Sequence, residues 1–341
     1  MTMTQELVAR SIVQSKGRVC AATLALVALV ALLVALELCL GSTNYDIPTV
    51  ASVLVGHNVR GATYAIWQVR VPRIIAAVLA GIAFGIGGNT FQTVLGNPLA
   101  SPDVIGISSG ASTVAVIAIM VFGLGVREVS PVALVGGICI SLAIFGLSQL
   151  GGFSEGKLVL IGLGTQALMR AVTSAVLLYG AEYDVPTALR WLSGSLSGMD
   201  LGDVAPLVLV LPVAPVVLVL GRDLETLVLG QDAAQTLGVR VSLSRAVLLL
   251  GSVAMIGIAT SVTGPVACVM LLAGPIATRL VGEKSRATMA AAMVAIALML
   301  LADLVGHNLL GTRFPVGVVT GILGAPYLLW LLMREGGVSR T

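Results

Sequence analysis

Ten apolar runs, each close to the length needed to cross a bilayer, restrict the fold of this chain more than any other feature. They cover approximately residues 19–40, 72–91, 105–124, 131–150, 158–180, 204–220, 246–263, 266–281, 287–306 and 316–333. A membrane-spanning helix needs about 20 mostly apolar residues. The runs are continuous and do not alternate between apolar and polar residues, as the strands of a membrane barrel do. We therefore predict an all-α, polytopic membrane protein with about ten transmembrane helices.

The composition indicates the same class of protein. Only 10% of the 341 residues are charged, whereas soluble domains carry about 25% charged residues. The 40 glycines suit helices that pack closely in lipid. The first run is too long for the apolar part of a signal peptide, so we expect it to be retained. The predicted organisation is an N-terminal segment 1–18, a single transmembrane domain 19–333 and a tail 334–341.

Basic residues predict the orientation of the chain. Ten crossings place both termini on one side, and cytoplasmic segments carry an excess of Lys and Arg. With the termini inside, the inner segments hold twelve basic residues: Arg10, Lys16, Arg18, Lys157, Arg222, Arg240, Arg245, Arg279, Lys284, Arg286, Arg334 and Arg340. The outer segments hold six: Arg60, Arg70, Arg73, Arg127, Arg190 and Arg313. We therefore expect both termini to be cytoplasmic.

The segment 222–245 is a long charged stretch between two apolar runs. Its pattern predicts two short cytoplasmic helices, Leu224–Leu229 ending at Gly230 and Gln231–Leu237 ending at Gly238, because glycine suits a left-handed C-cap. Asp223 is placed to accept from the free amides of the first helix. Such a hairpin is well placed to receive force from a soluble partner.

Three charged residues interrupt the apolar runs: Glu37, Arg170 and Asp303. Charge inside a membrane span is costly and by default prompts a functional interpretation. Glu37 and Asp303 lie near outer span ends, where we expect them to reach water. Arg170 lies mid-span, and two interpretations stay open: a structural pair with a neighbouring helix, or a candidate pathway residue that attracts an anionic or carbonyl-rich solute.

Other motifs predict no further chemistry. Gly151, Gly156 and Lys157 match most of a phosphate-binding loop, but Leu158 stands where Ser or Thr would hold Mg²⁺. His57 and His307 stand alone, and the four cysteines match no zinc or haem spacing. We expect no metal site, no cofactor bound by this chain and no catalytic residues.

Six stretches, spread over nearly the whole chain, together resemble a known family: VRVPRIIAAVLAG (69–81), NPLASPDVIGISSGAS (97–112), WLSGSLSG (191–198), LGQDAAQTLGVRV (229–241), SVTGPVACVMLLAGPIATRLVG (261–282) and FPVGVVTGILGAPYLLWLL (314–332). They are similar to the FecCD and vitamin B12 permease family, the membrane-spanning subunits of type II ABC importers. The resemblance implies ten helices per subunit, two permease subunits around a central pathway, two ATPase subunits below and a soluble binding protein above. ATP and Mg²⁺ would belong to the ATPase subunits.

The resemblance also implies roles for individual residues. The cytoplasmic coupling helices would lie at about 222–241, and the ATPase contacts would come from Leu229, Gly230, Gln231, Asp232, Ala233, Ala234, Thr236, Leu237 and Gly238. Arg70 and Arg73 match outer arginines that pair with glutamates of the binding protein, and we expect them to be exposed. His307 replaces a usual outer arginine, so Arg313 is the remaining docking candidate.

Two further departures affect the inner side: GPIATR (274–279) replaces the usual PHIAR, and ACVML (267–271) replaces GFVGL. These changes would suit pairing with a second permease chain of different sequence, so a heterodimer with a related permease is favoured. The leading hypothesis is a non-catalytic permease subunit for an iron(III)–siderophore complex in the cytoplasmic membrane of a prokaryote. Cobalamin and haem are the alternative solutes. More distant alternatives are an ion-coupled secondary transporter, which would need carboxylates or broken helices mid-membrane, and a membrane-embedded enzyme.

Overall fold

Ten long helices account for the ten predicted spans in the described part of the chain. The computed structural model describes residues 3–152, 154–227, 236–238, 240–282, 287–308 and 313–338. The helices are α1 (Met3–Cys39), α4 (Val71–Val94), α5 (Ile107–Met120), α6 (Val126–Gln149), α7 (Glu155–Tyr179), α10 (Val210–Leu227), α12 (Val241–Thr263), α13 (Ala267–Val281), α14 (Ala287–Asn308) and α15 (Val316–Val338). Seven of the described helices are long and apolar enough to cross a membrane, and three apolar helices are shorter. The predicted all-α membrane fold is confirmed.

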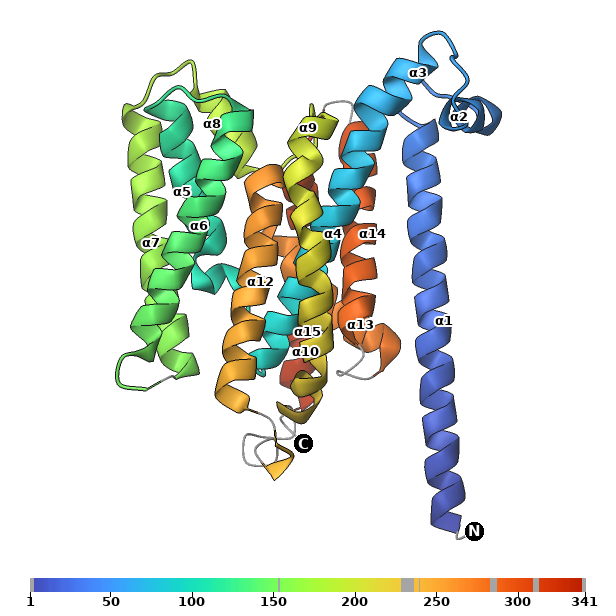
Figure 1. Cartoon of the computed structure of the whole chain (residues 1–341), viewed down its shortest axis with the longest axis vertical. Helices are drawn as coiled ribbons and strands as arrows, with labels where there is room; N and C mark the ends of the chain where they lie inside the picture. Colours follow the sequence, from blue (N-terminus) through green and yellow to red (C-terminus); the bar gives the residue numbers. More distant parts are fainter. Residues whose placement is uncertain are drawn as a thin grey trace.

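The helix α4 forms the centre of the molecule (Figure 1) and packs against α14, α12, α13 and α10. Small residues allow this close packing. A Cβ atom added to Gly85 would lie 2.4 Å from the carbonyl oxygen of Ala291 on α14, and one added to Gly88 would lie 2.5 Å from that of Met270 on α13. Glycine therefore brings these helix backbones into contact, as expected for helices in lipid.

Helices α5, α6 and α7 form a second group at one side of the molecule, and α1 stands at the other side (Figure 1). Within this group α5 packs against both α6 and α7, while α12 connects the group to the centre. The first helix packs mainly against α14 and α13, and most of its described surface is uncovered.

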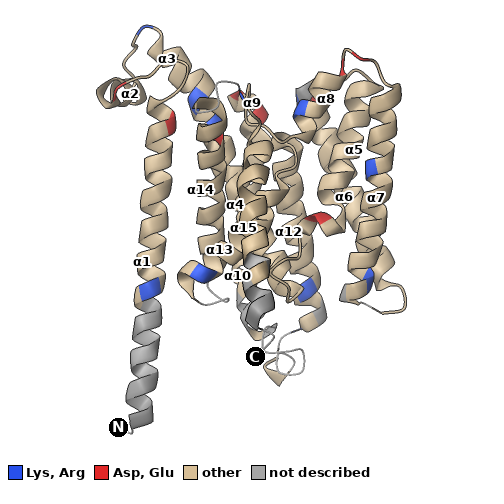
Figure 2. Cartoon of the chain, turned by 180° about the vertical axis from the view of Figure 1, so that it is seen from behind, with Lys and Arg blue, Asp and Glu red and all other residues tan. Residues whose placement is uncertain are grey.

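Short helices lie at one end of the molecule: α2 (Ile47–Leu54), α3 (Ala62–Tyr64), the π-helix η1 (Ala65–Arg70), α8 (Val185–Leu192), α9 (Leu201–Val204) and the 3₁₀ helix η3 (Ala205–Leu209). The N-terminal ends of α1 and α12 and the C-terminal ends of α10 and α15 lie at the opposite end (Figure 1). Figure 2 shows that the charged residues gather mainly at these two ends and interrupt the middle in few places. Both ends of the described chain therefore lie at the same end of the molecule, as expected for an even number of membrane crossings.

The predicted hairpin in segment 222–245 needs one correction. Residues up to Leu227 continue α10 and do not begin a separate helix at Leu224, so Asp223 is not an N-cap. Leucine and glutamate favour the helix interior, and the stretch from Leu218 to Leu227 contains no proline, so nothing ends α10 where the apolar run stops. The helix simply extends beyond its apolar run. The remainder of the first predicted helix, and most of the second, lie outside the described residues.

Candidate functional site

An open cavity of about 580 Å³ lies between the α5–α7 group and the C-terminal helices. Its lining is rich in hydroxyl groups and also contains two charged side chains. Most of the polar lining residues come from the 3₁₀ helix η2 (Pro102–Ile105), from α5 and from α7: Asp103, Ser108, Ser109, Ser112, Thr113, Gln166, Arg170, Thr173 and Ser174. The rest of the lining is Leu177, Leu192, Ser193, Pro265, Ala267, Cys268, Gly317 and Val318. The volume lies within the range of about 300–1,000 Å³ typical of small-molecule sites.

A break between α4 and α5 positions the inner wall of this cavity. After Gly96, which has a φ of +60°, the Asn97 side chain accepts from the Leu99 amide at 2.9 Å. Ser101 then caps η2 by accepting from the Asp103 amide at 3.3 Å. The chain turns again at Gly106, with a φ of +74°, and enters α5. The predicted irregular connection at NPLASPD therefore places Asp103 in the cavity wall.

Helix α7 approaches this connection closely because residue 162 is glycine. A Cβ atom there would lie 1.6 Å from the carbonyl oxygen of Val104, so any larger residue would push α7 away. Further along α7, Gln166, Arg170 and Thr173 follow at helical spacing and share one face. Thr113 of α5 fixes this face, since its hydroxyl lies 2.9 Å from that of Thr173 and donates to the Met169 carbonyl at 3.1 Å.

Arg170 lines this cavity and its side chain is exposed in the single chain. It forms no ion pair or hydrogen bond with the side chains that the structure describes. The interpretation as a structural pair with a neighbouring helix therefore finds no support in the described part of this chain. An arginine at the centre of a span costs about 2.5–3.5 kcal/mol on insertion scales, so a polar cavity is the environment that tolerates it.

Asp103 is a cavity residue that the sequence reasoning missed. Its Oδ1 atom is buried and has no hydrogen-bond partner among the described residues. Loss of hydration raises the pKa of the Asp103 carboxyl above its usual value, and the charge of Arg170 partly opposes this. The signal was present in the sequence: a Ser-Pro-Asp triplet follows an Asn-Pro break between two apolar runs.

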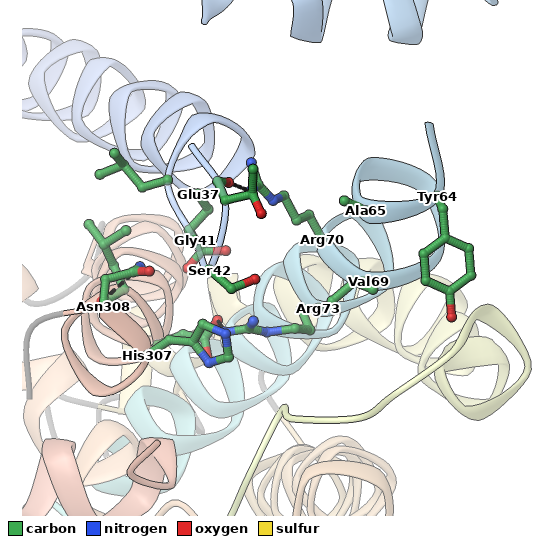
Figure 3. A pocket seen from close by; sticks show the side chains of 14 residues that line it. Glu37, Gly41, Ser42, Tyr64, Ala65, Val69, Arg70, Arg73, His307 and Asn308 are labelled. Carbon is green, nitrogen blue, oxygen red and sulfur yellow. Dashed lines mark hydrogen bonds and ion pairs between the residues drawn. The ribbon is translucent and has the colours of Figure 1, made fainter. Parts of the chain in front are cut away.

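A second, smaller cavity of about 220 Å³ lies near the C-terminal ends of α1 and α14 and the N-terminal end of α4. Figure 3 shows Glu37, Arg70, Arg73 and His307 around it. Arg73 forms an ion pair with Asp303, and only 10% and 5% of the two side chains are exposed. Glu37 is also buried, and its Oε1 atom lacks a hydrogen-bond partner among the described residues.

These contacts correct two expectations. Glu37 and Asp303 are buried, because the C-terminal ends of α1 and α14 and the N-terminal end of α4 meet around them. Arg70 and Arg73 are buried, not exposed. The Arg70 guanidinium donates to the carbonyls of Leu38 and Thr43 and lies 4.8 Å from the ring centre of Tyr45. It therefore satisfies one carbonyl in the last turn of α1, where a cation is favoured, and one in the connection that follows the helix.

The remaining predicted site residues are described only in part. Arg313 is exposed. Leu229, Gly230, Gln231, Asp232, Ala233 and Ala234 lie outside the described residues. Thr236, Leu237 and Gly238 are exposed, and Gly238 has a φ of +85°, which fits the predicted left-handed C-cap. These three residues lie between α10 and α12, at the end of the molecule where α1 begins.

Lys157, the lysine of the partial phosphate-loop pattern, bonds to carbonyl groups of the connection between α6 and α7. Its Nζ atom donates to the carbonyls of Leu150 and Gly152, both at 3.3 Å. These bonds close the turn between α6 and α7. The contacts give the lysine a structural role in a turn between two spans.

Comparison with known proteins identifies the family. The model of the FecCD transport family matches residues 28–334. The chain is 36% identical to an achromobactin permease of Dickeya dadantii over 94% of this chain and 92% of that protein. It is 34% identical to a ferric enterobactin permease of Escherichia coli over 86% of this chain and 90% of that protein.

More distant matches are also permeases or transporters of the ABC type. Identity to a vitamin B12 permease of Yersinia enterocolitica is 28% over 80% of this chain and 83% of that protein. A metal-chelate type ABC transporter solved in an inward-facing conformation superposes with a TM-score of 0.81 at 25% identity, covering 91% of this chain and 98% of that one. The chain therefore belongs to the FecCD transport family.

Proposed function

We propose that this chain is a permease subunit of an ATP-driven importer that moves an iron(III)–siderophore complex across the cytoplasmic membrane. The observation that carries the proposal is the hydroxyl-rich cavity between α5, α7, α13 and α15. A polar cavity inside a membrane protein is the place where a hydrophilic solute can be held away from lipid. No covalent chemistry is required of this chain.

The cavity needs a second subunit to become a closed pathway. It is open, and the helices α7 and α15 that line it also present large exposed apolar side chains, among them Leu160, Leu168, Ile322 and Leu323. A second permease chain, related but different, would cover these faces and supply the other half of the pathway. Two ATPase subunits and an extracytoplasmic binding protein complete the proposed importer.

Energy would enter through the connection between α10 and α12. In the proposed mechanism the ATPase subunits grip Leu229–Gly238, and their closure on ATP changes which side of the pathway is open. Both termini would share the cytoplasmic side with this connection. The exposed Arg313 would contribute to docking of the binding protein through charge, which mainly sets orientation and encounter rate. Arg70 and Arg73 could contact the binding protein together with Arg313 only if they broke their present contacts within this chain.

Relatives named for iron complexes support the choice of solute. The ferric enterobactin permease is 34% identical to this chain, compared with 28% for the vitamin B12 permease. Cobalamin and haem are the alternative solutes. A secondary transporter would use unpaired membrane carboxylates. Asp303 is paired with Arg73, whereas Glu37 and Asp103 each have a buried oxygen without a partner among the described residues. The match to the FecCD transport family, and not the state of these acids, therefore favours the ATP-driven importer.

The test is uptake into proteoliposomes that contain the complete importer. Wild-type complex should accumulate a ⁵⁵Fe-labelled siderophore only with ATP, the ATPase subunits and the binding protein. Ala234→Pro should keep ATP hydrolysis but lose most uptake, because proline breaks the predicted second coupling helix; Ala234→Ser is the matched control.

Two results would contradict the proposal. Uptake that persists without the ATPase subunits and stops when a proton gradient is dissipated would instead establish a secondary transporter. ATP-driven uptake of cobalamin or haem, but of no ferric siderophore, would replace the solute while leaving the importer role intact.

A further inference from the structure

We infer that the cavity selects ferric chelates of net negative charge and that Arg170 is the residue that recognises them. The inference rests on the proposed function and specifies its substrate class. Arg170 is the cation of the cavity lining and is exposed to the cavity. No described carboxylate neutralises it by direct contact, so its five N–H donors are available to a solute.

The rest of the lining suits an oxygen-rich surface. Ser109, Ser112 and Thr173 present hydroxyl groups from two helices, and Gln166 adds an amide one helical turn before Arg170. These groups donate or accept hydrogen bonds without adding charge. Carboxylate or catecholate oxygens around a ferric ion would find donors on both walls, whereas a cationic chelate would meet the guanidinium as a like charge.

Asp103 provides the internal check on this inference. It lines the same cavity but forms no ion pair with Arg170 among the described contacts. If Arg170 selects anions, a negative charge at Asp103 opposes their binding, and its removal leaves binding unchanged or strengthens it. If the two residues instead form a gate that pairs in another state, removal of either one should damage the same step. Arg170 and Asp103 variants therefore distinguish the two roles. Selection predicts weaker binding only when Arg170 is replaced, whereas gating predicts the same loss when either residue is replaced.

The experiment measures equilibrium binding to the nucleotide-free complex of permease and ATPase subunits in lipid nanodiscs. The binding protein is omitted, so that its own specificity does not enter. The probes are ⁵⁵Fe-labelled ferric citrate and ferric enterobactin, both net anions, and ferrioxamine B, a net cation. Wild-type complex should bind at least one anion more tightly than the cation, and rising salt should weaken that binding.

Arg170→Gln should weaken binding of the anion about ten-fold or more, as expected for loss of a charge-assisted contact, and should reduce its salt dependence. Arg170→Lys should retain most of the affinity, and Asp103→Asn should not weaken it. Arg190→Gln, which removes an exposed positive charge of α8 outside the cavity, is the matched control and should bind like wild type.

Several results would overturn the inference. These are no binding of either anion to wild type, equal affinity for the cation, unchanged binding in Arg170→Gln, or equal losses in Arg170→Gln and Asp103→Asn. Failure of Arg170→Gln to assemble, with Arg170→Lys intact, would assign Arg170 to an ion pair with the second subunit and would also overturn it. The proposed function has a separate readout, since ATP-driven uptake of a ferric siderophore by wild type would support it in each case.

Discussion

At the scale of single residues, Arg73 and Asp303 form an ion pair that is almost fully buried. It joins α4 to α14 across 230 positions of sequence and lies beside Glu37 of α1. Taking two charges out of water is costly, and their mutual attraction offsets this cost only while both are present. The pair therefore fixes the register of two helices without guaranteeing a large net gain in stability.

Removing one partner of the Arg73–Asp303 pair should lower the stability of the protein more than removing both partners. Asp303→Asn is expected to lower the free energy of unfolding, because the Arg73 guanidinium loses its ion-pair partner and keeps only Glu37 of the same cavity as a nearby carboxylate. The loss should be smaller than the loss of about 3–5 kcal/mol expected for a buried charge left without any partner. The double variant Arg73→Met with Asp303→Leu should lose less than either single variant. Thermal unfolding in detergent, compared with wild type, measures both.

Additive losses in the double variant, or a single variant as stable as wild type, would show that the two charges do not depend on each other. Arg313→Gln, at an exposed outer arginine, is the control for loss of one positive charge and should not change stability.

The sequence could predict which residues are unusual at this scale, but not their partners. Arg170 is recognisable because it stands alone in an apolar run, and the structure places it in the cavity. Asp303 was expected to reach water because distance along its span was the only available measure of depth. Its burial depends on α4 and on the outer end of α1, which come from other parts of the chain. Asp103 lies in an irregular connection, where no periodicity indicates the direction of a side chain.

At the scale of helices, the glycines of α4 determine how closely its neighbours approach. Gly81 and Gly85 are one helical turn apart, and both face α14. A Cβ atom would lie 2.7 Å from the Ile296 Cα at Gly81 and 2.4 Å from the Ala291 oxygen at Gly85. Because the obstructing atoms belong to backbone, a side-chain rotation cannot make room. The whole helix would have to move.

Gly85→Ala should therefore destabilise the protein even though alanine favours helices more than glycine does. Overpacking of a tight core typically costs about 1–3 kcal/mol, whereas the gain in helix propensity is at most about 1 kcal/mol. The expected result is a lower midpoint of thermal unfolding. Gly146→Ala on α6 is the matched control, because nothing lies within 4 Å of the added Cβ atom, and it should be neutral or stabilising.

A Gly85→Ala protein as stable as the Gly146→Ala control would mean that α4 and α14 can separate without loss. The packing described for these two helices would then not limit stability.

Helix number was predictable from the sequence, whereas helix ends were less so. Each of the ten apolar runs contains a helix, because hydrocarbon forces the backbone to bond within its own segment. The shorter α5 and α13 follow the breaks at NPLASPD and Gly264–Pro265, which the sequence displays. Helix α10 extends beyond its apolar run to Leu227. The hydrophobicity of the sequence predicts which part of a helix lies in lipid. It does not predict how far the helix continues into water.

At the scale of the whole molecule, the cavity lies where the α5–α7 group meets the helices around α13 and α15, while α1 stands at the opposite side. The group and the centre are joined mainly through α12 and through the connection that contains η2. A small rotation of one group against the other would therefore change the cavity while leaving the packing around α4 intact. This separation suits a transporter that opens alternately to two sides.

The direction of import depends on which end of the molecule faces the cytoplasm, and thiol labelling tests this directly. The four native cysteines are free and would be replaced. Single cysteines would then be introduced at the exposed positions Leu237, between α10 and α12, and Asn58, between α2 and α3. In intact spheroplasts a membrane-impermeant maleimide should label Asn58→Cys and leave Leu237→Cys unlabelled, and inverted vesicles should give the opposite pattern. Basic residues predict this result, because the inner segments hold twice as many of them as the outer segments. The reversed pattern would place the predicted coupling segment outside the cell, away from ATP, and an importer powered through that segment would then be untenable.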